Sequence, residues 1–168
     1  MKDRKKMQQS AHVHPYEYLF IVGEGTYGVV WKARDKEKKK LVAIKKIKQD
    51  TQSVNASEGV PVTACREISV MRELEHENII NLQDIYLDFK DQTISLVLDW
   101  AELDFKEIIK YHKNNRLPSL HMVKSLMWQL IKGIEYLHDS WVMHRDLKPS
   151  NLLGEFLLCS FFCSIKSK

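Results

Sequence analysis

Eight consecutive residues at positions 144–151, with the sequence HRDLKPSN, place a carboxylate, an ammonium group and an amide within one short stretch. Phosphoryl transfer uses such groups to orient a hydroxyl, neutralise phosphate charge and bind a metal ion. In this interpretation Asp146 accepts or orients the proton of a substrate hydroxyl, Lys148 neutralises the transferred phosphate, and Asn151 binds Mg²⁺. The alternative is a plain surface loop, which requires eight ordered residue types to match by chance.

A glycine motif at positions 23–28, with the sequence GEGTYG, fits the pattern G-x-G-x-x-G. It is typical of a dinucleotide site where it joins a strand to a helix, and of a flap over nucleotide phosphates where it joins two strands. A plain glycine-rich hairpin is the third interpretation. Residues 29–34 alternate with the two-residue period of a strand, which favours the flap. Gly23, Gly25 and Gly28 would then let the backbone approach the phosphates closely.

Two charged residues between these motifs could complete a nucleotide site. Lys45 lies in an apolar strand pattern on the side of Ala43, opposite Val42 and Ile44. Its ammonium group would neutralise the α- and β-phosphates, and Glu67 in the following helix pattern would hold the lysine in place. Each residue alone also fits a plainer interpretation, as a surface lysine on a strand and a solvent-exposed glutamate on a helix.

These residues must be positioned by a small sheet and by helices. Apolar runs between turn signals predict five strands, which are Tyr18–Val22, Val29–Arg34, Leu41–Ile47, Leu82–Leu87 and Ile94–Trp100. The first three form an antiparallel meander, because their connections are too short for crossover helices. One helix is inserted from Thr63, and two more follow the strands within 104–114 and 121–141. The predicted class is α+β, with a sheet lobe and the beginning of a helical lobe.

The last of these helix patterns is apolar over roughly half of its circumference, whereas a helix covered on one side needs a stripe of about 100°. Its apolar residues are Met122, Val123, Leu126, Met127, Leu130, Ile131, Ile134 and Leu137. We therefore expect this helix to need neighbours on several sides. Where those neighbours are missing, an exposed patch that promotes aggregation is expected.

The 168 residues are 44% hydrophobic and 29% charged, which indicates a globular protein rather than a disordered or fibrous one. Much of the formal charge of +4 lies at the N-terminus and in residues 34–40, as expected for solvated ends and turns. The longest apolar run, at 156–165, is too short to span a bilayer. An odd number of cysteines and no secretory signal predict a reducing, intracellular location. We expect no membrane partner and no direct nucleic-acid binding.

The motifs follow one another in the order found in protein kinases, and the chain resembles that family over about residues 16–153. Within it, GEGTYGVVWKAR and PVTACRE, at 23–34 and 61–67, resemble cyclin-dependent kinases. The segments ACREISVMREL, YHKNNRLP and GIEYLHDSWVMHRDLKPSN most resemble the Mediator-associated branch, which pairs with a C-type cyclin. The resemblance implies ATP and Mg²⁺ as cofactors and phosphate transfer to serine and threonine of proteins such as the RNA polymerase II C-terminal domain. It also implies transcription regulation, association with the Mediator complex and a nuclear location.

The resemblance implies roles for individual residues as well. Leu98 would be the gatekeeper beside the adenine, and the backbone of Asp99 and Ala101 would hydrogen-bond to the base. The residues that would enclose the base are Val22, Val30, Ala43 and Leu153. Phosphorylation of Thr26 or Tyr27 would add about −1.5 to −2 charges beside the ATP phosphates and block ATP use. The residues that would bind a cyclin are Pro61, Val62, Thr63, Ala64, Cys65 and Arg66.

The expected organisation has four parts. These are a basic, disordered tail at 1–15, a complete kinase N-lobe with a five-stranded antiparallel sheet and one helix at 16–100, the first part of a kinase C-lobe at 101–153, and a divergent tail at 154–168. Kinases continue past the asparagine to an Asp-Phe-Gly motif and an activation segment, and the 168 residues contain neither, so we expect this chain to be inactive alone. Glu155 is not expected to replace the aspartate, because no strand pair precedes it to aim it at the metal.

The tail has its own interpretation. Gly-Glu-Phe at 154–156 can be encoded with a GTGAGT splice-donor sequence, so the tail is interpreted as translated intron in an incomplete gene model. The alternatives are a truncated isoform and a non-catalytic fragment that captures a cyclin.

Overall fold

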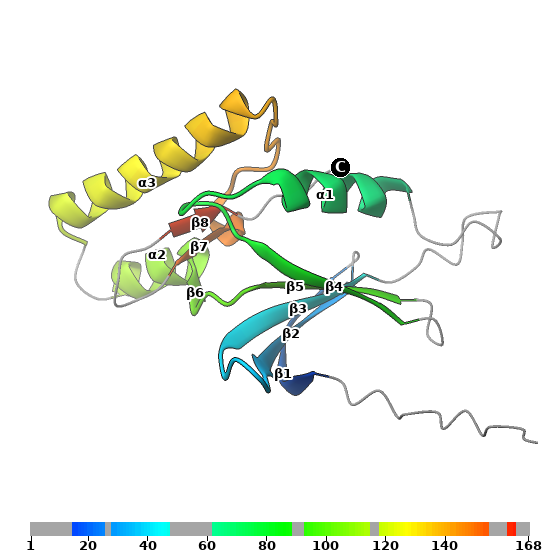
Figure 1. The fold of residues 1–168 in the computed structure, drawn as a ribbon. Coiled ribbons are helices and arrows are strands. Elements are labelled where there is room, and N and C mark those ends of the chain that lie inside the picture. The colour runs from blue at the N-terminus through cyan, green and yellow to red at the C-terminus, as the bar shows by residue number, and fades with distance from the viewer. Residues whose placement is uncertain are drawn as a thin grey trace, which may run out of the picture.

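The computed structural model describes residues 15–25, 28–47, 62–88, 93–114, 118–154 and 161–163. Its larger sheet has the strand order β1-β2-β3-β5-β4, and each neighbouring pair is antiparallel. The strands are β1 (Tyr16–Gly25), β2 (Gly28–Asp35), β3 (Leu41–Ile47), β4 (Leu82–Asp88) and β5 (Thr93–Asp99). The five predicted strands are therefore confirmed. Because a strand and not a helix leaves Gly28, the dinucleotide interpretation is excluded (Figure 1).

Helices and a second, small sheet complete the described structure. The helices are α1 (Val62–Glu73), inserted between β3 and β4, then α2 (Phe105–Asn114), α3 (Leu120–Asp139) and the 3-10 helix η1 (Pro149–Asn151). The small sheet has the order β6-β7-β8, with β6 (Leu103–Asp104), β7 (Leu152–Gly154) and β8 (Phe161–Cys163). Figure 1 shows this sheet beside α2. None of the helices in the described ranges has the length and hydropathy of a membrane-spanning segment.

The small sheet corrects one expectation. β6 pairs with β7 and β7 pairs with β8, so the expectation that no strand pair precedes Glu155 is wrong. The pairing is non-local, since Leu103 lies opposite Gly154 and Leu152 lies opposite Cys163. Strands of two and three residues carry too little alternation for the sequence pattern to predict them. The divergent tail therefore contributes Gly154 of β7 and the whole of β8 to this sheet.

The large sheet has a buried cluster on each face. One cluster consists of Tyr16, Ala33, Val42, Ile44 and Val97. The other, which we call the α1-side cluster, consists of Met71, Ile80, Ile94, Leu96 and Leu98. Ala43 packs against the α1-side cluster, whereas its neighbours Val42 and Ile44 belong to the first cluster. The predicted division of β3 into two faces is therefore confirmed, and Lys45 lies on the face of Ala43.

α3 is held against the connection between α1 and β4. Leu137 of α3 is fully buried in a cluster with Leu74 and Ile79. The hydroxyl of Tyr136 accepts a hydrogen bond of 2.9 Å from the backbone N–H of Glu75. The Tyr136 ring also stacks on His76, with ring centroids 4.8 Å apart. α3 is therefore fixed relative to the large sheet, and so is the start of the loop that follows it.

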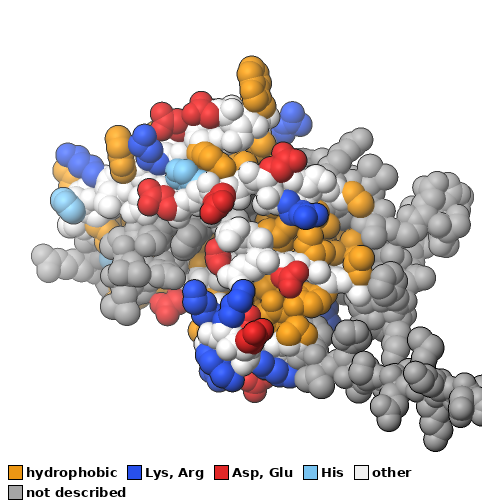
Figure 2. All heavy atoms as spheres, viewed as in Figure 1, with side chains coloured by type: hydrophobic (Ala, Val, Ile, Leu, Met, Phe, Trp, Pro, Cys, Tyr) orange, Lys and Arg blue, Asp and Glu red, His pale blue; other side chains and the backbone are white. Residues whose placement is uncertain are grey.

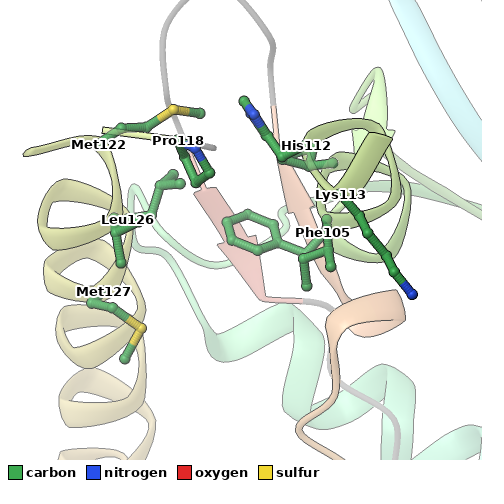
Figure 3. Close-up of a pocket in the computed structure, with 10 residues that line it drawn as sticks. Phe105, His112, Lys113, Pro118, Met122, Leu126 and Met127 are labelled. Carbon is green, nitrogen blue, oxygen red and sulfur yellow. The ribbon is translucent and has the colours of Figure 1, made fainter. Parts of the chain in front are cut away.

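Another side of α3 is apolar and exposed. Val123, Ile131 and Trp128 are 40%, 53% and 63% exposed, which confirms an uncovered apolar patch within the described structure. Between α2 and α3 lies an apolar cavity of about 410 Å³. Figure 3 shows Phe105 of α2 facing Leu126 of α3 across it. The broad apolar face of α3 is therefore only partly covered, as the sequence predicts for a helix that needs neighbours on several sides.

The turn between β2 and β3 carries much of the basic charge. Residues 36–40, four of them lysines, are exposed. Figure 2 shows Lys and Arg side chains gathered at this end of the large sheet. The buried carboxylate of Asp35 accepts backbone hydrogen bonds from Glu37 and Lys38 at 2.8 and 2.9 Å. The charge thus belongs to a tight, solvated turn, as the sequence predicts.

Gly28 has the strongest backbone requirement in the glycine motif. Its φ is +135°, and a Cβ atom there would lie 1.8 Å from the backbone oxygen of Lys46. We expect Gly28→Ala to lower the free energy of unfolding by about 2–3 kcal/mol, because backbone strain and overpacking act together. Urea denaturation measures this. Gly23→Ala is the matched control, because an added Cβ there meets nothing within 4 Å; equal losses in both variants would contradict the expected clash.

Candidate active site

The loop at 144–151, which we call the HRDLKPSN loop, is shaped by its own first residues. His144 is only 4% exposed, and its Nδ1 accepts a hydrogen bond of 3.2 Å from the backbone N–H of Asp146. Arg145 between them has a φ of +60°, in the left-handed region, which turns the chain sharply. The buried imidazole therefore anchors the backbone of the aspartate.

The structure brings Asp146, Lys148 and Asn151 into contact. Nδ2 of Asn151 donates to the backbone oxygen of Asp146 at 2.7 Å and to its Oδ2 at 2.9 Å. The Nζ atom of Lys148 lies 3.0 Å from the same Oδ2. Asn151 is 2% exposed, while the side chains of Asp146 and Lys148 are 31% and 48% exposed. A buried amide thus supports a carboxylate and an ammonium group that are partly exposed to solvent.

A short 3-10 turn explains why these three residues meet. Pro149 stands at the first turn of η1, where its missing N–H is not needed. The backbone N–H of Asn151 donates to the carbonyl of Lys148 at 2.9 Å. This bond turns the chain back, so that the Asn151 side chain contacts Asp146, which precedes it by five positions.

The same residues fit part of a magnesium site. Amide and carboxylate oxygens are ligands that Mg²⁺ accepts. Both of these side-chain bonds of Asn151 use Nδ2, so its Oδ1 could serve as an oxygen ligand. In the described part of the chain, no three His, Cys, Asp or Glu side chains form a group that could hold a metal. Mg²⁺ usually takes nucleotide phosphates and water as further ligands.

Lys45 lies on the sheet face that the α1-side cluster occupies. In the strand register it is opposite Val30 on β2 and Leu96 on β5, and directly opposed residues share a face. Leu153 of β7, two residues beyond the HRDLKPSN loop, packs against the same cluster as Ala43. β7 therefore attaches the end of that loop to the sheet face that carries the lysine.

Glu67 and the predicted cyclin-binding segment lie on or next to α1. The side chain of Glu67 falls outside the described part of the structure, so its pairing with Lys45 stays a prediction. Pro61 also lies outside it. In the rest of the segment, the described side chain is that of Cys65, which is exposed. α1 itself is positioned through Met71, which is buried against the sheet.

The glycine motif sits at the end of the β1–β2 pair. Gly23 lies opposite Val30, and Gly25 lies opposite Gly28 where the two strands leave the motif. The space beside Gly23 is open, because an added Cβ would meet no atom within 4 Å. Thr26 and Tyr27 lie outside the described residues. Among the residues predicted to enclose adenine, the structure leaves Val22 exposed and partly buries Val30, Ala43 and Leu153.

The predicted hinge begins at the end of β5. Leu98 is 8% exposed within the α1-side cluster. The backbone N–H of Asp99 donates to the carbonyl of Asn81 at 3.2 Å. Its carboxylate accepts from the Asn81 N–H at 3.3 Å and from Nε2 of Gln83 at 2.5 Å. These bonds tie the hinge to the start of β4, and none of the three uses the carbonyl oxygen of Asp99.

Sequence reasoning missed a contact beside the hinge. The Nζ atom of Lys32 lies 4.4 Å from the centroid of the Trp100 ring and 5.5 Å from that of Phe20. The alternation of residues 29–34 was the available signal, because it places Lys32 on the same face as Val30.

Comparison with known proteins identifies the relatives of this chain. The protein kinase domain family matches residues 16–157. Cyclin-dependent kinase E-1 of Arabidopsis thaliana is 46% identical over 141 residues, which cover 82% of this chain and 29% of that protein. "Probable cyclin-dependent kinase 8" of Dictyostelium discoideum is 47% identical over 140 residues, covering 82% and 36%. Serine/threonine-protein kinase srb10 of Schizosaccharomyces pombe is 41% identical over 145 residues, covering 82% and 39%.

The chain thus spans between 29% and 39% of the length of these three relatives. The matched residues include the glycine motif, Lys45, Glu67 and the HRDLKPSN loop. The fold agrees with the match, since a five-stranded antiparallel sheet with one inserted helix precedes the helices. The chain belongs to the protein kinase family, and cyclin-dependent kinases are among its relatives there.

Proposed function

We propose that this chain supplies the ATP-facing part of a cyclin-dependent serine/threonine kinase, with an N-lobe at 16–100 and the first part of a C-lobe at 101–153. The observation that carries the proposal is the contact of Asp146 with both Lys148 and Asn151 at 3.0 and 2.9 Å. Supporting it, β7 attaches their loop to the sheet face that carries Lys45. A carboxylate, two ammonium groups and a metal-binding amide are the groups that phosphoryl transfer needs.

The proposed chemistry follows from where these charges lie. Asp146, held at Oδ2 by two donors, would align the hydroxyl of a serine or threonine and receive its proton. Lys148 beside it would stabilise the negative charge on the transferred phosphate, and Lys45 would do so at the α- and β-phosphates. Oδ1 of Asn151 would bind the metal. Mg²⁺ and ATP, when bound, supply the metal charge and the phosphate.

The partners are proposed from the resemblance and from the relatives' names. Two of the relatives are named as cyclin-dependent, which supports a cyclin bound at residues 61–66. The resemblance to the Mediator-associated branch supports a C-type cyclin, association with Mediator, and the RNA polymerase II C-terminal domain as a substrate. It supports transcription regulation in the nucleus on the same grounds.

A non-catalytic, cyclin-binding role is the second candidate. The 168 residues contain no Asp-Phe-Gly sequence, whose aspartate positions the metal in kinases. We expect these 168 residues, mixed with a C-type cyclin, to retain the cyclin in a pull-down without transferring phosphate to a polymerase C-terminal domain peptide. If the 168 residues did transfer phosphate, and Asp146→Asn abolished that transfer, this expectation would be overturned.

A chimera tests the kinase proposal itself. Residues 1–153 of this chain replace the matching region of S. pombe srb10, and the chimera is assayed with ATP, Mg²⁺, a C-type cyclin and a serine-containing peptide. We expect phosphate transfer, and we expect Lys45→Met in the chimera to abolish most of it because phosphate charge is no longer neutralised. A chimera that folds and binds the cyclin, yet transfers no phosphate, would contradict the proposal.

A further inference from the structure

A lysine and two aromatic rings meet at the outer end of the predicted adenine site. Lys32 of β2 lies opposite Phe20 of β1 and opposite Ala43 of β3, so its side chain shares the face of Ala43. Its ammonium group lies 4.4 Å from the centroid of the Trp100 ring and 5.5 Å from that of Phe20. Both distances are within the range of attraction between a cation and the face of an aromatic ring.

Trp100 lies in the predicted hinge. It directly follows β5 and lies between Asp99 and Ala101, whose backbone groups are proposed to bind the adenine. Its Nε1 atom is buried without a hydrogen-bond partner in the part of the chain that the structure describes. The indole N–H therefore does not fix the ring, whereas the ammonium group of Lys32 contacts the ring face.

The hinge is thus held on two sides. Towards β4, the backbone N–H and carboxylate of Asp99 bond to Asn81 and Gln83. Towards β2, the Trp100 ring contacts the ammonium group of Lys32. Because the second contact acts on the residue between the two proposed adenine-binding positions, its loss would loosen the backbone that must meet the base.

We propose that Lys32 is a positioning residue for adenine, which acts by clamping Trp100 and so pre-forms the hinge. The inference rests on the proposed function, since adenine is the ligand concerned. Pre-forming a binding backbone raises affinity by lowering the ordering cost of binding. Lys32 therefore determines affinity at the base end of the nucleotide, whereas Lys45 acts at the phosphate end.

The test uses the 168-residue chain with Lys32→Met, which keeps an apolar stem but removes the charge. We expect adenosine to bind about three- to tenfold more weakly, and tripolyphosphate to bind with unchanged affinity. We also expect faster hydrogen exchange at the backbone amides of Trp100 and Ala101. Lys32→Arg should restore both properties, because a guanidinium group also binds aromatic faces.

The matched control is Lys46→Met. The Nζ atom of Lys46 lies 4.9 Å from the centroid of the Tyr18 ring, a similar contact on the opposite face of the sheet. Lys46→Met should change neither the affinity for adenosine nor the rate of hydrogen exchange at the amides of Trp100 and Ala101. The proposal would be overturned if the two methionine variants had equal adenosine affinities and exchange rates, or if Lys32→Arg restored neither property. A parent chain that binds no adenosine would contradict the proposed function instead, and the exchange rates would still decide whether the clamp exists.

Discussion

Replacing Asp146 with asparagine in the srb10 chimera is expected to lower the rate of phosphate transfer by about three orders of magnitude. Asparagine keeps an oxygen that can accept the 2.9 Å bond from Asn151, so the loop retains its shape. It cannot take up the hydroxyl proton, and it loses the charge that pairs with Lys148 at 3.0 Å. The loss should therefore appear in kcat, while the KM for ATP changes little.

Asp139→Asn is the matched control for this variant. Asp139 is an exposed acid at the end of α3, so its substitution removes the same charge close to the loop. We expect the control to keep phosphate transfer within about twofold of the parent chimera, as is usual for exposed positions. Steady-state transfer of labelled phosphate measures both. A loss of less than tenfold in Asp146→Asn would count against the proton-accepting role.

Leu137→Ala is expected to lower the free energy of unfolding of the chain by about 3–4 kcal/mol, because it opens a cavity in a closed cluster. Leu137 is 0% exposed and packs with Leu74 and Ile79, which join α1 to β4. This cluster holds α3 against the connection between α1 and β4, so its loss should also loosen the HRDLKPSN loop that follows α3. Urea denaturation measures the free energy, and faster hydrogen exchange at residues 144–151 would report the loosened loop.

Ile131→Ala tests whether that cost comes from burial. Ile131 lies on the same helix but is 53% exposed, so a substitution of similar size removes little buried area. We expect a loss of less than about 1 kcal/mol. If the two variants were equally destabilised, α3 would not be anchored through Leu137 as described.

Much of the large sheet could be predicted because its signals are local. Residues 29–34 alternate after the glycine motif, and β2 forms there. Val42 and Ile44 are buried on one face of β3 while Ala43 packs on the other, as a two-residue period requires. The start of α3 is also encoded locally, since the Ser119 hydroxyl accepts the N–H of Met122 at 3.1 Å.

The rest could not be predicted, because it depends on contacts between distant residues. The small sheet exists because Leu103 meets Gly154, and neither two-residue β6 nor three-residue β7 has a pattern of its own. The contact of Lys32 with Trp100 likewise joins β2 to the residue after β5, which lies far away in the sequence. Within the site, the spacing of Asp146 and Asn151 suggests one loop, but the 3-10 turn that places the amide under the carboxylate emerges only in the structure.

In the proposed kinase site, Lys45 of the sheet and Lys148 of the HRDLKPSN loop face the phosphates of one nucleotide. An acyl phosphate ester of ATP tests it directly, because a lysine amine near the terminal phosphate attacks the acyl carbon, keeps the acyl group and releases ATP. The chain is treated with this reagent and Mg²⁺, and mass spectrometry locates the acylated lysines. We expect Lys45 and Lys148 to be acylated faster than exposed lysines such as Lys38, and we expect excess ATP to suppress their acylation. Acylation spread evenly over the surface lysines and insensitive to ATP would contradict it.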